Sequence, residues 1–362
     1  MRLPRLPVNC NILREVIDAM DFFDLDYRNS FRKLFTALMV PYKPGTFEID
    51  EEAYRKLLRY FLQPKFVDAG GGLIVNPEAG EVFYLTFKEK RRLLEIAMEE
   101  AGGKMMIIAG ACDLTTENTV KDAVVAKELG ADGIFFLPPM GSGDITRGLD
   151  LHTHPEVWTD MMDAIVDASG LPLIVHPTAG GVSAYGSGIP EGPTLAICKK
   201  VPAIVGWKMT YSYIGWYKVA KALRTLEPPV AVLAALGSVW HTALLNEHFD
   251  GSVNGSLCYA MEPMVDHVAA WRENNLDKAK AVWKSGLDEF HDYVYGDPAR
   301  MHIKYKIGTW LRGLVPEPFM RPPQPRPMRA EVAVMKSFLE RLGLEMIPEE
   351  EIKRVLSNDL ML

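Results

Sequence analysis

The chain is predicted to fold as a closed (β/α)8 TIM barrel with an N-terminal arm and a helical C-terminal extension. Short apolar runs alternate with helical repeats over roughly 220 residues, which is typical of a barrel of eight parallel strands. No glycine-rich fingerprint follows the first run, which disfavours an open dinucleotide-binding sheet. We therefore expect an arm at 1–33, a barrel at 34–258 and an extension at 259–362.

The predicted strands are short apolar runs, because a strand buried on both faces has no polar side. They are 35–40, 72–76, 105–109, 133–137, 171–176, 203–208, 230–235 and 251–255. The helices between them are 50–62, 86–101, 115–129, 155–168, 193–200, 215–226 and 238–248.

Helix-start signals support two of these helices. Asp50 is a suitable N-cap for the first, and Thr86 with Glu89 has the spacing of a capping box. The arm is predicted to hold one helix at 11–22. The extension is predicted to hold helices at 261–274, 276–293 and 299–312, then a proline-rich stretch at 316–327 and a last helix at 330–342.

Composition and charge exclude several classes of partner. The 362 residues carry 40 Lys and Arg against 47 Asp and Glu, a net charge of −7, so neither nucleic acid nor an anionic membrane is expected as a partner. The four cysteines form no CxxC pair, which argues against structural zinc or a disulfide framework. With no signal-like start and no long apolar run, we expect a cytoplasmic protein.

The strand order places one lysine and one histidine side by side. Chemistry in such barrels lies at the carboxyl ends of the strands, where His176 ends the fifth run and Lys208 the sixth. A lysine after the apolar run 202–207 loses hydration, so its pKa falls and its free amine can attack a ketone to form a Schiff base. His176 could relay protons near neutral pH. The alternative from these residues alone is a strand that ends in a surface lysine.

Other strand ends supply candidate substrate-binding residues that would share this mouth of the barrel. These are Asn76, Glu78, Ala79, Gly80, Met140, Thr210, Asn254 and Gly255.

Several segments together resemble the class I Schiff-base lyases of the dihydrodipicolinate synthase and N-acetylneuraminate lyase superfamily. The segments are FTALMVPY, PEAGEVFYLTFKEK, IIAGACDLTTENTVKDAVVAKELGADGIFFLPP, LPLIVHP, IVGWKMT and FDGSVNGS, in the family's order. The resemblance implies that Lys208 forms an imine with pyruvate or another 2-oxo acid, so that no separate cofactor is needed. It also implies a homo-oligomer, a dimer or a tetramer. The proline-rich tail loosely resembles the aromatic hydratase-aldolase branch.

The chain departs from the family pattern at its proton relay. Glu78 and Ala79 replace the two threonines of the GTTGE turn, and His176 replaces the tyrosine after the fifth strand. Met140 stands where a second relay tyrosine is usual, so the Tyr–Thr–Tyr relay is absent. His176 is the expected acid/base instead. Glu78 would either act as a second base or repel a substrate carboxylate, or it would pair with a cation outside the pocket.

Two other functions stay open. His152 and His154 form an HxH pair that could serve a metal-dependent hydrolase, although the pair precedes a helix that starts with Pro155, and helix-entry histidines are the simpler interpretation. We therefore assign no metal site. The missing relay residues also fit a family member that has lost catalysis and binds a ligand or partner.

Overall fold

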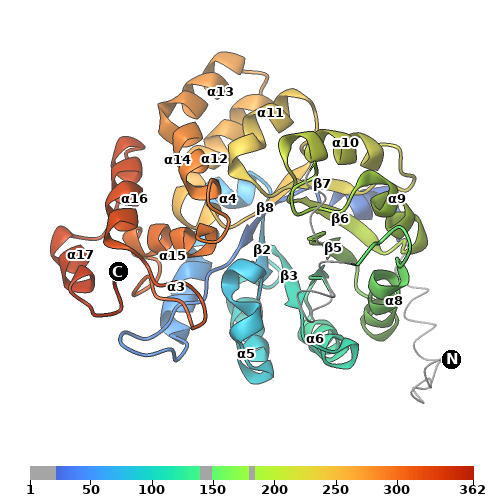
Figure 1. Ribbon diagram of the computed structural model, residues 1–362, viewed down its shortest axis with the longest axis horizontal. Coiled ribbons are helices and arrows are strands. Elements are labelled where there is room, and N and C mark those ends of the chain that lie inside the picture. Colours follow the sequence, from blue (N-terminus) through green and yellow to red (C-terminus); the bar gives the residue numbers. More distant parts are fainter. Residues whose placement is uncertain (1–21, 139–148, 179–183) are drawn as a thin grey trace.

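The computed structural model describes residues 22–138, 149–178 and 184–362, and these form a closed parallel barrel in the strand order β1 to β8 (Figure 1). The strands are β1 (Leu34–Ala37), β2 (Gly71–Val75), β3 (Met106–Ala111), β4 (Gly133–Phe136), β5 (Leu173–Val175), β6 (Ile204–Met209), β7 (Ala231–Ala234) and β8 (Gly251–Asn254). The ring closes because β1 pairs with both β2 and β8.

Each predicted strand is present, but several are shorter than their apolar runs. β1 ends at Ala37, although Leu38, Met39 and Val40 are also buried. Apolar side chains mark where the chain is buried, whereas a strand lasts only as long as its neighbour supplies hydrogen bonds. The predicted strand 35–40 therefore extends too far. The whole segment is nevertheless buried, as its apolar sequence indicates.

The barrel helices follow the predicted order. They are α3 (Glu51–Phe61), α5 (Phe87–Ala101), α6 (Thr116–Leu129), α8 (Glu156–Ser169), α9 (Glu191–Lys200), α10 (Tyr213–Leu223) and α11 (Trp240–Leu245). Asp50 caps α3 by accepting a hydrogen bond from the Ala53 N–H at 3.0 Å, and Thr86 and Glu89 form the capping box of α5. The short helices α2 (Leu25–Asn29) and α4 (Pro64–Asp68) were not predicted. The predicted arm helix at 11–22 lies almost wholly outside the described residues.

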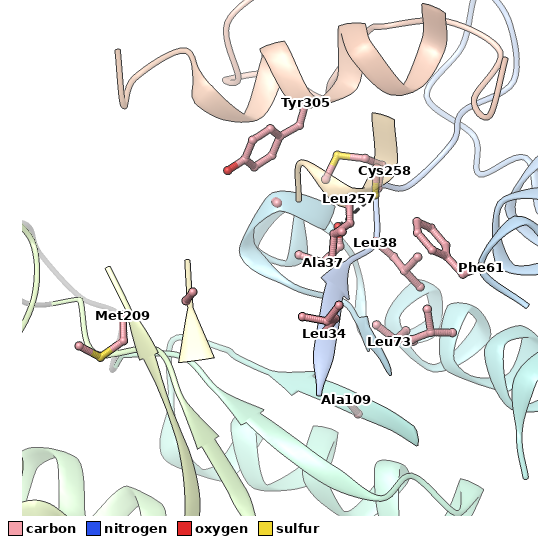
Figure 2. Packing of buried hydrophobic residues seen from close by; sticks show 14 of the residues in the cluster. Leu34, Ala37, Leu38, Phe61, Leu73, Ala109, Met209, Leu257, Cys258 and Tyr305 are labelled. Atoms are coloured by element: carbon pink, nitrogen blue, oxygen red, sulfur yellow. Dashed lines mark hydrogen bonds between the residues drawn. The ribbon is translucent and has the colours of Figure 1, made fainter. Parts of the chain in front are cut away.

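Two apolar layers lie on opposite faces of the sheet. Side chains inside the barrel form one cluster, which includes Phe35, Ile74, Phe135, Ile174 and Leu233. The other cluster fills the space between the strands and the helices, and Figure 2 shows part of it, including Leu34, Ala37, Leu73 and Phe61. Since successive side chains of a strand point to opposite faces, this division fixes which strand-end residues face the barrel mouth.

The C-terminal extension is helical, as predicted, with two differences in detail. Its helices are α12 (Leu257–Arg272), α13 (Leu276–Val282), α14 (Asp288–Tyr295), α15 (Met301–Leu311), α16 (Arg329–Arg341) and α17 (Glu349–Leu356). The predicted helix 276–293 is divided by a π-helical turn, Trp283–Leu287, in which Gly286 has a φ of 120° that favours glycine. α17 was not predicted. No helix in the described ranges is long and apolar enough to cross a membrane.

Helix α15 is fastened to the barrel by a buried ion pair. Lys306 Nζ lies 2.9 Å from Glu81 Oε1, and both side chains are fully buried. The other carboxylate oxygen of Glu81 accepts hydrogen bonds from the Tyr42 hydroxyl at 3.0 Å and the Arg321 N–H at 2.8 Å. Tyr305 projects from α15 toward the barrel (Figure 2) and packs where a Cβ on Gly255 would lie 2.5 Å from its ring. The extension is thus held directly over the end of β8 and the turn after β2.

Replacing Lys306 with methionine should lower the free energy of unfolding by about 3–5 kcal/mol, because it leaves the Glu81 carboxylate buried without its cation. Urea denaturation would measure the loss. The double variant Glu81→Gln, Lys306→Met should lose much less, since no uncompensated charge remains. Lys336→Met, which breaks a surface pair with Glu349, is the matched control and should change stability by less than about 1 kcal/mol. Equal losses in all three variants would contradict the assigned role of the pair.

Candidate active site

Lys208 and His176 meet inside the mouth of the barrel. Gly206 faces the interior, because a Cβ there would contact Leu233 and Ile174, so Lys208 two positions later also faces inward. His176 follows β5 and lies two positions after Ile174, on the same face. Lys208 Nζ is 3.3 Å from His176 Nε2.

Phe135 of β4 forms the apolar floor below both groups. Its ring centroid is 5.5 Å from Lys208 Nζ, and the His176 ring stacks on it with centroids 5.7 Å apart and planes 18° apart. Burial lowers the pKa of Lys208 to about 8, and the nearby Glu78 carboxylate opposes part of that shift. More of Lys208 is therefore free amine near neutral pH than of an ordinary lysine, and the free amine is the form that acts as a nucleophile.

Glu78 is the third member of the cluster. It begins the 3-10 turn Glu78–Gly80 that follows β2, and its Oε2 lies 3.3 Å from His176 Nδ1. Among the described atoms, Nδ1 makes no well-aligned hydrogen bond, so the pair is a close contact whose orientation is not optimal. Burial would raise the pKa of Glu78, but His176, His302 and Lys208 outweigh it and the pKa is lowered. Glu78 is thus an anion that faces the pocket.

The pKa of His176 differs from the one expected from the sequence, which was that of a histidine able to relay protons near neutral pH. Burial lowers its pKa most, the Lys208 ammonium lowers it further, and Glu78 only partly opposes them, so that the pKa is about 3. The side chain is 2% exposed, which explains the large effect of burial. His176 therefore stays neutral near pH 7 and does not titrate there. A neutral imidazole can still accept a proton at one nitrogen while it passes one on from the other.

His302 was not identified from the sequence. It lies in the first turn of α15, is half-buried, and interacts electrostatically with both Glu78 and Lys208. Burial lowers its pKa, Glu78 raises it and Lys208 lowers it. Its position in a helical extension gave no strand-end signal, and only the packing of α15 over the barrel brings it near.

The remaining candidates divide between the site and its surroundings. Ala79 and Gly80 share the turn with Glu78, and Gly80 has no room for a Cβ, which would lie 2.5 Å from the Leu38 carbonyl oxygen. Thr210 follows β6, and its hydroxyl is buried without a partner among the described residues. Gly255 lies against Tyr305. The role of these residues in substrate binding stays a prediction.

Two other predicted substrate-binding residues, Asn76 and Asn254, form side-chain hydrogen bonds with neighbouring elements. The Asn76 amide donates to the Lys90 carbonyl of α5 at 3.0 Å. The Asn254 amide donates to the Ala235 carbonyl and to the Tyr295 hydroxyl. Asn76 thus ties the end of β2 to α5, and Asn254 ties the end of β8 to the segment after β7 and to α14. Met140 lies outside the described residues.

The HxH pair takes part in surface contacts. His154 Nδ1 lies 3.2 Å from Glu156 Oε1, both side chains being about half exposed. His152 packs near Gly192, where a Cβ would lie 2.9 Å from its ring. In the parts of the chain that the structure describes, no three His, Cys, Asp or Glu side chains are grouped to hold a metal. Among the described residues, the pair therefore has no third side chain beside it that would complete a metal site.

Comparisons with known proteins identify the family. A sequence model of the dihydrodipicolinate synthetase family matches residues 30–337. The chain belongs to this family. Its members are lyases. The fold agrees: a pyruvate complex of a prophage protein of the dihydrodipicolinic acid synthase family from E. coli K12 superposes with a TM-score of 0.73 at 17% identity, covering 87% of this chain and 99% of that one.

Individual relatives are distant. A 4-hydroxy-tetrahydrodipicolinate synthase from Rhodopseudomonas palustris is 33% identical over 41% of this chain, and the match spans 45% of that relative's length. One from Acidiphilium cryptum is 28% identical over 87% of this chain and 99% of its own length. This chain is thus similar to synthases of the family across the barrel.

Replacing Glu78 with glutamine should lower the pKa of Lys208 below its value of about 8, because Glu78 raises that pKa and glutamine carries no charge. The rate at which an amine-directed acylating reagent labels Lys208 should rise with pH through about 8 in the unmodified protein. In the variant, the same rise should occur at lower pH. Glu117→Gln, on the exposed face of α6, is the control and should leave the profile unchanged. An unchanged or upward-shifted profile in Glu78→Gln would show that Glu78 does not act on Lys208.

Proposed function

We propose that the protein is a Schiff-base-forming carbon–carbon lyase, an aldolase or hydratase-aldolase, that acts on pyruvate or another 2-oxo acid. The observation that carries the proposal is a lysine amine with a lowered pKa, 3.3 Å from a neutral histidine, at the mouth of a barrel of this family. Lys208 would form the imine, so no further cofactor is required.

Imine formation would use Lys208 and His176 together. The Nζ lone pair adds to the keto carbon as the carbonyl π electrons move to oxygen. His176 Nε2 takes a proton from the new C–N–H group and returns it to the oxygen, which leaves as water after gaining a second proton. The nitrogen lone pair expels this water, which leaves a protonated imine, an iminium, that can accept an electron pair.

The iminium would then accept the electron pair of the carbon–carbon bond that breaks. In a 4-hydroxy-2-oxo acid, loss of the hydroxyl proton lets the C3–C4 electron pair move toward the iminium, so that an aldehyde leaves and an enamine remains. Protonation of the enamine at carbon and hydrolysis then release the 2-oxo acid and restore the amine. His176 is the proposed acid/base, and the contact of Glu78 with Nδ1 supports a role for Glu78 as its second base.

The turn after β2 bears on substrate choice. Glu78 and Ala79 offer no hydroxyl to a substrate carboxylate, and the Glu78 carboxylate adds a negative charge nearby. We therefore expect this protein to select its 2-oxo acid differently from family members that carry the GTTGE turn. Assembly as a dimer or tetramer and a cytoplasmic location stay predictions; a related family member is described as a monomeric variant.

Borohydride reduction in the presence of pyruvate should trap a covalent adduct on Lys208, because reduction converts the imine to a stable secondary amine. Peptide mass spectrometry would locate the adduct. Lys208→Met should abolish it, whereas Lys221→Met, which removes a surface lysine, should not. If pyruvate and several other 2-oxo acids all fail to give an adduct, the lyase proposal fails, and a binding role without catalysis becomes the better description.

Replacing His176 with alanine should leave the borohydride adduct measurable but slow proton exchange at the methyl group of bound pyruvate by about 10²–10⁴-fold, the usual contribution of a general acid/base. Proton NMR in D₂O would follow the exchange. Unchanged exchange in the variant would remove His176 from the mechanism.

A further inference from the structure

Three histidines form a cluster where the C-terminal extension meets the barrel. His241 comes from α11, His267 from α12 and His291 from α14, and these helices lie on one side of the barrel in Figure 1. Trp283, which begins the π-helical turn, packs against each imidazole, with ring centroids 5.1 to 5.8 Å apart. His267 and His291 are fully buried, and His241 is partly exposed.

His267 cannot take up a proton without losing its hydrogen bonds. Its Nε2 lies 3.2 Å from the Trp271 indole nitrogen and 3.0 Å from His241 Nδ1. Because an indole N–H can only donate, Nε2 must be the nitrogen of His267 that carries no proton. The proton of the ring is then on Nδ1, which is buried and has no partner among the described residues. A second proton would have to enter at Nε2, against the N–H groups that now point at it.

His291 also resists a second proton. Both of its ring nitrogens are buried, and neither has a partner in the described part of the chain. A protonated imidazole has two N–H donors, and both would be left unpaired away from water, which costs free energy. The ring is packed closely against Gly237, where a Cβ would lie 2.4 Å from Nδ1. The closed cluster therefore favours the neutral form of both buried rings.

The charged groups that face the cluster come from three elements, Lys280 of α13, Lys284 of the π-helical turn and Asp288 of α14. The two lysines repel a proton on His241. Asp288 attracts one, but its carboxylate is already paired with Lys284 Nζ at 2.6 Å. The buried histidines also face one another, so a proton on one opposes a proton on the next.

The cluster lies in the contact between α14 and the strand ends of the barrel. Gly237, against which His291 packs, begins the 3-10 turn after β7. One turn further along α14, the Tyr295 hydroxyl accepts a hydrogen bond from the Asn254 amide at 2.7 Å and lies 2.8 Å from Ser256 Oγ. A movement of α14 away from the barrel would therefore break contacts at the ends of both β7 and β8.

We propose that the histidine cluster is an acid-sensitive contact, which holds α12 and α14 against the ends of β7 and β8 near neutral pH and loosens as the pH falls. The proposal does not rest on the proposed function. When the contact opens, the imidazoles reach water and can take up the protons that the closed cluster refuses. Acid therefore favours the open form by mass action.

The direction of the effect follows from the two forms of each ring. Burial is the main reason that the pKa of His267 and the pKa of His291 are about 3 in the closed cluster, whereas a histidine in water has a pKa of about 6.5. Because the pKa is lower in the closed form, the contact is most stable above about pH 6.5 and weakens as the pH falls below it. Between about pH 7.5 and about pH 5.5, each ring should raise the opening equilibrium constant about tenfold, and the two together about a hundredfold.

Hydrogen–deuterium exchange of the full chain, read by peptide mass spectrometry at these two pH values, tests the proposal. After correction for the intrinsic exchange rate, protection of α12 and α14 should fall about a hundredfold at the lower pH, and that of β2 and β3 should fall less. His291→Phe keeps a ring and removes nitrogens that bind no described residue. His267→Gln keeps an oxygen acceptor for Trp271. Each variant should reduce the fall to about tenfold.

His154→Gln is the matched control, because it removes a histidine whose side chain is about half exposed, and it should keep the hundredfold fall. Thermal melting shows whether each variant is folded, and if His267→Gln is not, His291→Phe decides the question. The proposal is overturned if the unmodified protein shows no fall, or if β2 and β3 lose as much protection as α12 and α14. A fall of the same size in the folded cluster variants, or a smaller one in His154→Gln, would also overturn it.

Discussion

The partial dehydration of one amine is the constraint on which the rest of the site depends. Lys208 Nζ is held above the Phe135 ring and against His176, where burial brings its pKa to about 8. A barrel of alternating strands can do this because every second side chain points into a water-poor interior. The same confinement keeps His176 neutral, which makes a neighbouring carboxylate necessary if that imidazole is to move protons. Glu78 meets this need at His176 Nδ1.

The extension serves the site through a buried ion pair. Lys306 and Glu81 are both fully buried, and such a pair gives up the hydration of two charges for one attraction, so it contributes little net stability compared with apolar residues of the same size. Its value lies in orientation. The Glu81 carboxylate is bound at once by Lys306, by the Tyr42 hydroxyl and by the Arg321 N–H, and these contacts hold α15 against the turn after β2.

Glu78 and His176 stand where the family pattern has hydroxyl-bearing side chains. In the proposed reaction, a carboxylate at position 78 would stabilise the protonated Schiff base as well as the lysine, because both are cations. It also places a negative charge where a 2-oxo acid must bring its own carboxylate. Under the proposed function, the site would therefore favour the iminium at the expense of substrate affinity, unless the backbone of the turn after β2 supplies compensating N–H donors.

The sequence by itself determined the barrel, its strand order, and the meeting of Lys208 with His176, since strand-end position and side-chain parity are local properties that the apolar pattern records. It also marked Glu78 as unusual. It could not determine the pKa of His176, because burial by Phe135 and repulsion by Lys208 depend on the packing of separate strands. Nor could it reveal His302, or show that the side-chain amides of Asn76 and Asn254 bind the Lys90 and Ala235 carbonyls, because those contacts join different elements of the fold. Packing between separate segments decides these contacts and the pKa of His176, and no hydrophobic periodicity in the sequence records that packing.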